Sequence, residues 1–302
     1  MASVRQRELP KDPDAAAIVK VLAENVYVRR QDDVFEDFLS LALATLDRLP
    51  YHLQSVAAFG QHADDGEHAA EFQRIAGCYK RAEMEHFSHA LAMLLQAAKR
   101  EPYRDLLGDI YMAWGWPNTG AGQFFTPMSI CKLMAAMTMP DIEAECRKRV
   151  AQAIDAGPFA RMGLARGESI IQPGKEQVML HALLEHVEYL EPITVYDCAC
   201  GSGAMLLAAA SICPQWALDY AIVRFYGQDI DLTCTKMARI QLMLYGLNGY
   251  RMRCHIAAHG ALDDSARTLK KAPLTFVEPP MPSGEPTIVL PNPREVQLEM
   301  FA

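Results

Sequence analysis

The sequence predicts an α/β fold in which a parallel β-sheet follows an N-terminal helical domain. Between residues 13 and 117, apolar residues recur at steps of three and four, which is the spacing of amphipathic helices. From residue 193 onward, short β-branched runs alternate with helical stretches, and this rhythm is typical of a parallel sheet. We therefore expect a helical bundle over 1–117, an α/β domain over 118–282 with a helical insertion at 138–190, and a C-terminal tail over 283–302.

The composition is that of an ordinary globular protein of about two domains. Its 302 residues are 51% hydrophobic and 22% charged, which is enough apolar material for a sizeable core. No apolar run reaches the roughly 18 residues that a membrane helix needs. The charged N-terminus has no apolar stretch of a secretory signal, so we expect a cytoplasmic protein with no membrane partner. Eight cysteines without a C-x-x-C pair predict reduced thiols and no zinc site.

Three apolar stripes predict the helices of the N-terminal half. They run over 35–46, 72–79 and 87–95. At the start of the third stripe, His86 and His89 lie three residues apart, which allows either a metal site or a polar helix face. We favour the polar face and predict no metal, because this short cluster lacks the partner ligands of a metal site.

The middle of the chain changes character at W-P-N-T-G-A-G-Q-F-F-T-P, where proline and glycine break any helix. Helical patterns resume at 128–137, 141–155 and 176–190. The second of them carries a basic cluster at 147–149. Over 141–175, however, basic and acidic residues nearly balance, so this stretch is either a DNA contact or a solvated decoration. We favour the decoration.

Strands and helices alternate in the C-terminal half. We expect strands at 193–196, 223–226, 251–257 and 274–277, with helices at 204–213 and 232–245 between them.

A glycine turn after the first of these strands is the strongest sign of a binding site. It lies in the segment V-Y-D-C-A-C-G-S-G-A-M. The strand ends at Asp197, the turn contains Gly201 and Gly203, and a helix begins. Glycines let a backbone approach a ligand closely, and a helix N-terminus offers free N–H groups. Asp197 suits a cationic ligand group, and Asp229, at the end of the second strand, is placed to accept both hydroxyls of a ribose.

Three motifs in this order resemble the γ-type N6-adenine DNA methyltransferases. The resemblance is greatest to the modification subunits of type I restriction systems and to small stand-alone N-6 DNA methylases of mobile elements, and it covers residues 103–280. G-Q-F-F-T-P (122–127) is similar to a cofactor motif of the family, and D-C-A-C-G-S-G (197–203) to its D-P-A-C-G-S-G. The segment that begins G-Q-D-I-D at residue 227 is similar to the family's second strand end and the helix after it.

The resemblance implies a Rossmann-like sheet of the S-adenosylmethionine-dependent methyltransferases, truncated at the C-terminus because the sequence ends soon after residue 280. It implies S-adenosylmethionine as the cofactor, with its amino group on Asp197 and its ribose on Asp229. The cofactor-binding residues that it predicts are Phe125, Thr126, Pro127, Asp197, Gly201, Ser202, Gly203 and Asp229.

The catalytic motif of the family corresponds to Glu278, Pro279 and Pro280. In the family, a polar residue and a prolyl carbonyl accept hydrogen bonds from the amino group of the flipped adenine, and an aromatic residue stacks on the base. Glu278 can accept such bonds, but Met281 stands where the family has its aromatic residue. Two functions therefore stay open: a site-specific DNA adenine N6-methyltransferase, or a catalytically weak or dead methylase-like protein that binds cofactor, DNA or a partner in a regulatory role.

The resemblance also implies DNA as a partner, although the overall charge is unlike that of an autonomous DNA binder. The formal net charge is −8 and the pI is about 5.6, so we expect a specificity or recognition subunit to assist. The tail offers one more possible partner. Its residues Gln297, Leu298, Met300 and Phe301 resemble the peptide with which bacterial proteins dock on the DNA sliding clamp. The alternative, slightly favoured, is that this apolar end packs back on the sheet.

Overall fold

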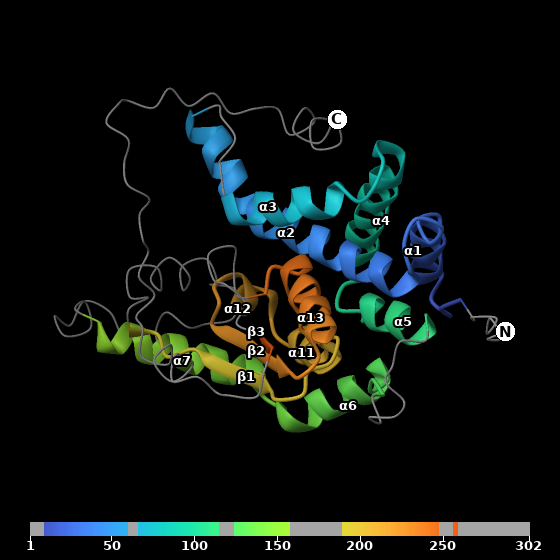
Figure 1. Cartoon of the computed structure of the whole chain (residues 1–302). Helices are drawn as coiled ribbons and strands as arrows, with labels where there is room; N and C mark the ends of the chain where they lie inside the picture. Colours follow the sequence, from blue (N-terminus) through green and yellow to red (C-terminus); the bar gives the residue numbers. More distant parts are fainter. Residues whose placement is uncertain (1–8, 60–65, 115–123, 158–188, 248–255, 259–302) are drawn as a thin grey trace. The chain divides into compact units, whose positions relative to one another are not determined.

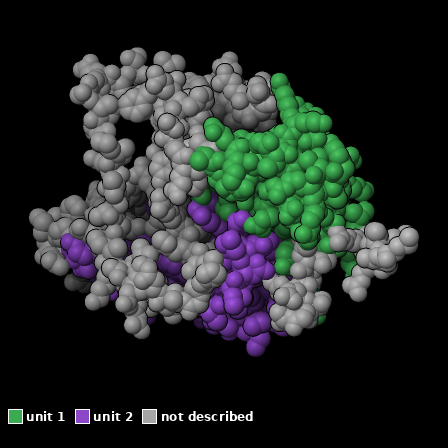
Figure 2. Space-filling view, viewed as in Figure 1, with its two compact units in different colours: residues 1–101, 106–124, 280–302 green, residues 102–105, 125–279 purple. Residues whose placement is uncertain are grey.

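The computed structural model describes residues 9–59, 66–114, 124–157, 189–247 and 256–258. The chain divides into two compact units, coloured separately in Figure 2. Unit 1 comprises Met1–Glu101, Leu106–Phe124 and Pro280–Ala302, and unit 2 comprises Pro102–Asp105 and Phe125–Pro279. Within the described ranges, no helix is both long enough and apolar enough to cross a membrane.

Unit 1 is helical over its described part, as the apolar stripes predict. Asp12 caps the first helix, because its Oδ1 accepts hydrogen bonds from the backbone N of Asp14 (2.9 Å) and of Ala15 (3.0 Å). The buried side of this helix includes Ile18 and Leu22. The described helices of the unit are α1 (Pro13–Ala23), α2 (Gln31–Phe59), α3 (Gly66–Ala76), α4 (Arg81–Arg100) and α5 (Leu106–Ala113) (Figure 1).

The core of unit 1 is organised around an aromatic group. The ring of Phe35 on α2 lies 6.4 Å from that of Phe38, 6.5 Å from that of Tyr111 on α5 and 6.1 Å from that of Trp114. All four side chains are buried. Burial of such rings is the main stabilising contribution that they make, and tilted or edge-on contacts add to it.

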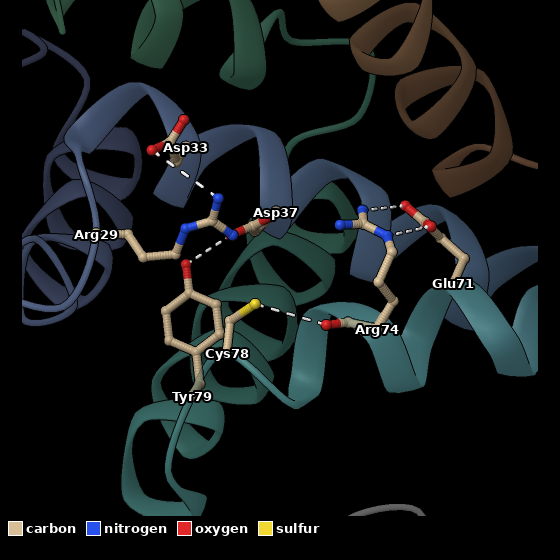
Figure 3. Close-up of polar contacts among 7 residues, drawn as sticks. All are labelled: Arg29, Asp33, Asp37, Glu71, Arg74, Cys78 and Tyr79. Carbon is tan, nitrogen blue, oxygen red and sulfur yellow. Dashed lines mark hydrogen bonds and ion pairs between the residues drawn. The ribbon is translucent and has the colours of Figure 1, made fainter.

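A buried carboxylate ties the start of α2 to the segment between α3 and α4. Figure 3 shows that Arg29 and Tyr79 both contact Asp37. Its Oδ2 accepts hydrogen bonds from Arg29 Nη1 and from Tyr79 Oη, both at 2.7 Å. Asp37 is 6% exposed and Tyr79 is 8% exposed, and burial raises the pKa of the tyrosine well above its usual value. The phenol therefore stays a neutral donor to the carboxylate.

Loss of this carboxylate is expected to destabilise unit 1. In Asp37→Ala the Tyr79 hydroxyl stays buried without its acceptor, so we expect the free energy of unfolding to fall by about 1–3 kcal/mol. Asp33→Ala is the matched control, because it removes the same charge from the same helix. The Asp33 side chain is 41% exposed and lies 3.9 Å from Arg29, so we expect a change of less than about 0.5 kcal/mol. Urea unfolding measures both, and equal losses would contradict the assignment.

Unit 2 contains a parallel sheet in the order β1–β2–β3, formed by β1 (Ile193–Asp197), β2 (Val223–Asp229) and β3 (Ile256–Ala258). The register of the first pair runs from Ile193 opposite Val223 to Asp197 opposite Gly227. The strands predicted at 193–196 and 223–226 are therefore confirmed. The third is described only at 256–258, which overlaps the end of the predicted range 251–257, and the predicted fourth strand lies outside the described residues.

Helices α11 and α13 cover one face of this sheet (Figure 1). Val223 and Phe225 of β2 are buried in one apolar cluster with Leu207 of α11 and with Ala238 and Leu242 of α13. Helix α12 is a short element that the sequence pattern did not predict. The described helices of unit 2 are α6 (Met128–Thr138), α7 (Ile142–Ala156), α11 (Ala204–Ser211), α12 (Gln215–Asp219) and α13 (Leu232–Leu244).

Candidate functional site

Two carboxylates end neighbouring parallel strands of unit 2. Asp197 is the last residue of β1, and Asp229 is the last residue of β2. Because the strands are parallel and Asp197 lies opposite Gly227, both acids are at the same edge of the sheet. Ligands of open α/β sheets bind outside this carboxyl edge. The structure therefore brings together the two acids that the sequence singles out.

The two carboxylates accept hydrogen bonds from backbone N–H groups in and around the glycine turn. Asp197 Oδ1 accepts from Ala199 N (3.0 Å). Asp229 accepts from Gly201 N through Oδ2 (2.8 Å) and from Asp231 N through Oδ1 (2.9 Å). Asp229 thus links the turn after β1 to the loop after β2. Each carboxylate oxygen has a second lone pair, so Asp229 can still accept a hydroxyl from a ligand.

Both glycines of the turn adopt backbone conformations that suit glycine. The φ angle is +54° at Gly201 and +95° at Gly203, and Gly203 immediately precedes α11. We expected these glycines to make room for a ligand, but protein atoms occupy the space beside each. A Cβ on Gly201 would lie 3.1 Å from the ring of Phe125, and one on Gly203 would lie 3.2 Å from Ala238 of α13. The described structure therefore assigns both glycines to close internal packing.

The segment before α6 contributes the predicted aromatic residue to this site. The ring of Phe125 packs on Gly201, although the two residues are far apart in sequence. The backbone O of Thr126 accepts a hydrogen bond from Cys131 Sγ (3.4 Å). Pro127 stands at the N-cap of α6, where its missing N–H costs nothing. Phe125 is therefore the member of this trio whose side chain directly supports the turn.

Ser202 and Cys200 are internal parts of the turn. Ser202 is 1% exposed, and its hydroxyl donates to Asp105 Oδ2 (2.6 Å). Cys200 is buried close to Gly227, where a Cβ would lie 2.9 Å from the thiol sulfur. Burial, together with the charges of Asp197 and Asp229, raises the pKa of the Cys200 thiol to about 12. Cys200 is therefore neutral at pH 7 and fills space rather than acting as a nucleophile.

Three residues of this region were missed by sequence reasoning. Ile230 follows Asp229 at the carboxyl end of β2. It is 85% exposed, which is unusual for a large apolar side chain. The apolar residue between two acids in D-I-D was a signal for it. Asp105 and Gln241 join the turn through hydrogen bonds, and no local pattern marked either of them.

Other predicted residues lie outside the described residues. They are the catalytic candidates Glu278, Pro279 and Pro280, with Met281, and the tail residues Gln297, Leu298, Met300 and Phe301.

The basic cluster of the insertion is engaged with acidic neighbours on its own helix. On α7, Arg147 Nη2 lies 2.8 Å from Glu143, Lys148 Nζ lies 3.4 Å from Glu145, and Arg149 Nε lies 2.9 Å from Glu145. These ion pairs neutralise much of the basic cluster. The described helix is not a solvated decoration, however, because its Cys146, Val150 and Ile154 are buried in the apolar cluster of unit 2.

Of the two histidines of α4, His86 belongs to a polar cluster of unit 1, and His89 is exposed. His86 Nδ1 lies 2.7 Å from Asn25 Oδ1, and Asn25 Nδ2 donates to the backbone O of Glu83 (3.0 Å). Asn25 is fully buried, so these bonds satisfy its amide. In the ranges that the structure describes, no group of three or more His, Cys, Asp or Glu side chains is placed to hold a metal ion.

Comparison with known protein families relates the sequence around this site to one family. Residues 177–283 match the family model of the N-6 DNA methylases. This region of the chain is similar to the N-6 DNA methylases. It contains the three strands, the glycine turn, Asp229 and the predicted catalytic motif at 278–280, and the match supports a DNA methyltransferase. Phe125 lies before the matched region in the sequence, and its ring packs beside Gly201 of that region. No curated protein matched the chain in sequence.

Proposed function

We propose that the protein is an S-adenosylmethionine-dependent DNA adenine N6-methyltransferase. The observation that carries the proposal is Asp229 at the end of β2, bonded to the glycine turn inside the methylase-like region. We further propose that the described sheet is part of a Rossmann-like methyltransferase fold, in which cofactors bind at this edge.

The residues at this edge fit S-adenosylmethionine chemically. Asp229 has acceptor capacity for ribose hydroxyls, and the exposed Ile230 beside it offers an apolar surface to an adenine ring. Asp197 offers a carboxylate to the amino group of the methionine moiety. Its Oδ1 holds Ala199 N, which fixes the carboxylate for that contact. Phe125 supports the turn between the two acids.

When bound, S-adenosylmethionine supplies a methyl group on a positively charged sulfur. In the proposed reaction the chain contributes hydrogen-bond acceptors for the adenine amino group, namely the carboxylate of Glu278 and the carbonyl of Pro279. These acceptors orient the nitrogen lone pair and stabilise the positive charge that develops on the amino group. The base reaches them by flipping out of the duplex. DNA is then the substrate, and a recognition partner compensates for the acidic charge of the chain.

Methyl transfer to unmodified DNA is the decisive test of this function. With labelled S-adenosylmethionine, we expect slow formation of N6-methyladenine, detected by mass spectrometry of the digested nucleosides. The rate is expected to be slow because Met281 lacks an aromatic face to stack on the base. Glu278→Ala is expected to lower the rate on the order of 100-fold, by removal of one preorganised acceptor. An unchanged rate in Glu278→Ala would refute this active site.

Met281 also favours a second candidate function, in which the protein binds the cofactor as a regulatory methylase-like module without turnover. The two functions differ in one comparison. If calorimetry shows that the protein binds S-adenosylmethionine, while no methylated adenine forms with or without a recognition partner, the regulatory function replaces the enzymatic one.

A further inference from the structure

Three hydrogen bonds form a closed ring around the middle residue of the glycine turn. Ser202 Oγ donates to Asp105 Oδ2 (2.6 Å), and Gln241 Nε2 donates to Asp105 Oδ1 (2.8 Å). The same amide nitrogen also donates to the backbone O of Ser202 (2.7 Å). Both N–H groups of the Gln241 amide are therefore used. Ser202 and Gln241 are each 1% exposed, so little water competes for these bonds.

The position of the ring matches a physical weakness of the turn. Ser202 lies between Gly201 and Gly203, and glycine loses more conformational freedom on ordering than any other residue. A turn with a glycine on each side of one residue is ordered more readily when that residue is fixed from outside as well. The ring holds Ser202 by its hydroxyl and by its carbonyl. None of these three hydrogen bonds involves Asp197 or Asp229, the two acids that are proposed to contact the cofactor.

The two residues before Asp105 contact Tyr245, the C-cap residue of α13, and so hold Asp105 close to this helix. The ring of Tyr103 lies 5.0 Å from that of Tyr245, and Arg104 N donates to Tyr245 Oη (3.4 Å). Tyr103 has a φ of +62°, a costly conformation for a residue with a side chain, which persists when surrounding contacts dictate it. The segment Pro102–Asp105 accordingly groups with unit 2, although α4 before it and α5 after it belong to unit 1.

We propose that Asp105 is a positioning residue for the cofactor: through Ser202, it holds the glycine turn in the conformation that receives S-adenosylmethionine. The proposal rests on the proposed function, since the cofactor is the ligand that the turn would receive. Asp105 acts on the turn through its bond to Ser202. A turn ordered beforehand loses less conformational entropy on binding, so the affinity is higher.

Three variants separate hydrogen bonding from charge and from local disturbance. Asp105→Ala removes both acceptors and opens the ring. Asp105→Asn keeps the ring, because its Oδ1 can accept from Gln241 while its amide donates to the Ser202 hydroxyl, which also has acceptor lone pairs. Tyr103→Phe is the control on the same segment, since it removes only a hydroxyl 3.5 Å from Gln215 Oε1.

Two measurements test the proposal. Calorimetry of S-adenosylmethionine binding is expected to show a dissociation constant raised on the order of 10-fold in Asp105→Ala, and within about threefold of the parent in Asp105→Asn and Tyr103→Phe. Hydrogen exchange of the cofactor-free protein is expected to be faster over residues 198–206 in Asp105→Ala alone. Exchange in α7 serves as an internal reference, because a general loss of stability would accelerate it as well.

The results decide separately whether Asp105 positions the turn and whether the protein binds S-adenosylmethionine. If Asp105→Ala binds the cofactor as tightly as the parent and leaves exchange of the turn unchanged, Asp105 has no positioning role. Equal losses in Asp105→Asn and Asp105→Ala would overturn the ring of hydrogen bonds as the cause. If the parent binds no S-adenosylmethionine, the proposed function fails, and the exchange measurement still decides whether Asp105 orders the turn.

Discussion

Asp229→Ala is expected to raise the dissociation constant for S-adenosylmethionine by about 100-fold or more, close to abolishing binding. The proposed contacts to the ribose are hydrogen bonds to a charged group, each worth about 1.5–3 kcal/mol, and two such bonds account for a loss of this size. The substitution also frees Gly201 N and Asp231 N, which hold the turn and the following loop on this carboxylate. Isothermal titration calorimetry measures the change directly.

Asp231→Asn is the matched control for this prediction. It removes one negative charge two residues away, while asparagine can still cap α13 by accepting from Thr233 N, as Asp231 does at 2.8 Å. We expect its affinity for the cofactor to stay within about threefold of the parent, because the Asp231 carboxylate caps α13 and makes no proposed contact with the cofactor. Asp197→Ala is expected to weaken binding as well, by about 10-fold, through loss of one charged contact. Parental affinity in both Asp229→Ala and Asp197→Ala would rule out this edge as the cofactor site.

Gly203→Ala is expected to cause the largest loss of stability in unit 2. The φ of +95° costs an alanine about 1–2 kcal/mol, and its Cβ would lie 3.2 Å from both Cα and Cβ of Ala238. Because part of the obstacle is helix backbone, the turn and α13 must move apart, at a further cost of about 1–3 kcal/mol. We expect a total of about 3 kcal/mol in urea unfolding, with weaker cofactor binding wherever the variant still folds.

Gly246→Ala measures the loss of stability that a positive φ causes by itself, without a steric clash. Gly246 has a φ of +63°, but no atom of the described residues lies within 4 Å of the place that a Cβ would take, so alanine there meets strain without a clash. We expect a loss of about 1 kcal/mol. The difference between the two variants measures the close approach of the turn to α13. If both variants lose the same stability, that close approach contributes nothing, and the packing role of Gly203 is wrong.

Elements with a regular hydrophobic period could be predicted from the sequence. The apolar stripe at 35–46 lies in α2, and the β-branched runs at 193–196 and 223–226 became β1 and β2. Helix α12, over Gln215–Asp219, was missed because five residues are too few to show a helical period. Pro214, at its N-cap, was the available signal.

The pattern of residues along the chain was sufficient to predict the order strand, glycine turn and helix, with an acid ending each of two strands. These features are local, because each depends on residues adjacent in sequence. The partners across space were decided by the tertiary structure alone. Folding brings Phe125 onto Gly201 and Ala238 against Gly203, and it carries Asp105 to Ser202, 97 positions further along the chain. Such contacts depend on how helices and strands pack, and neither hydrophobic period nor motif spacing encodes that packing.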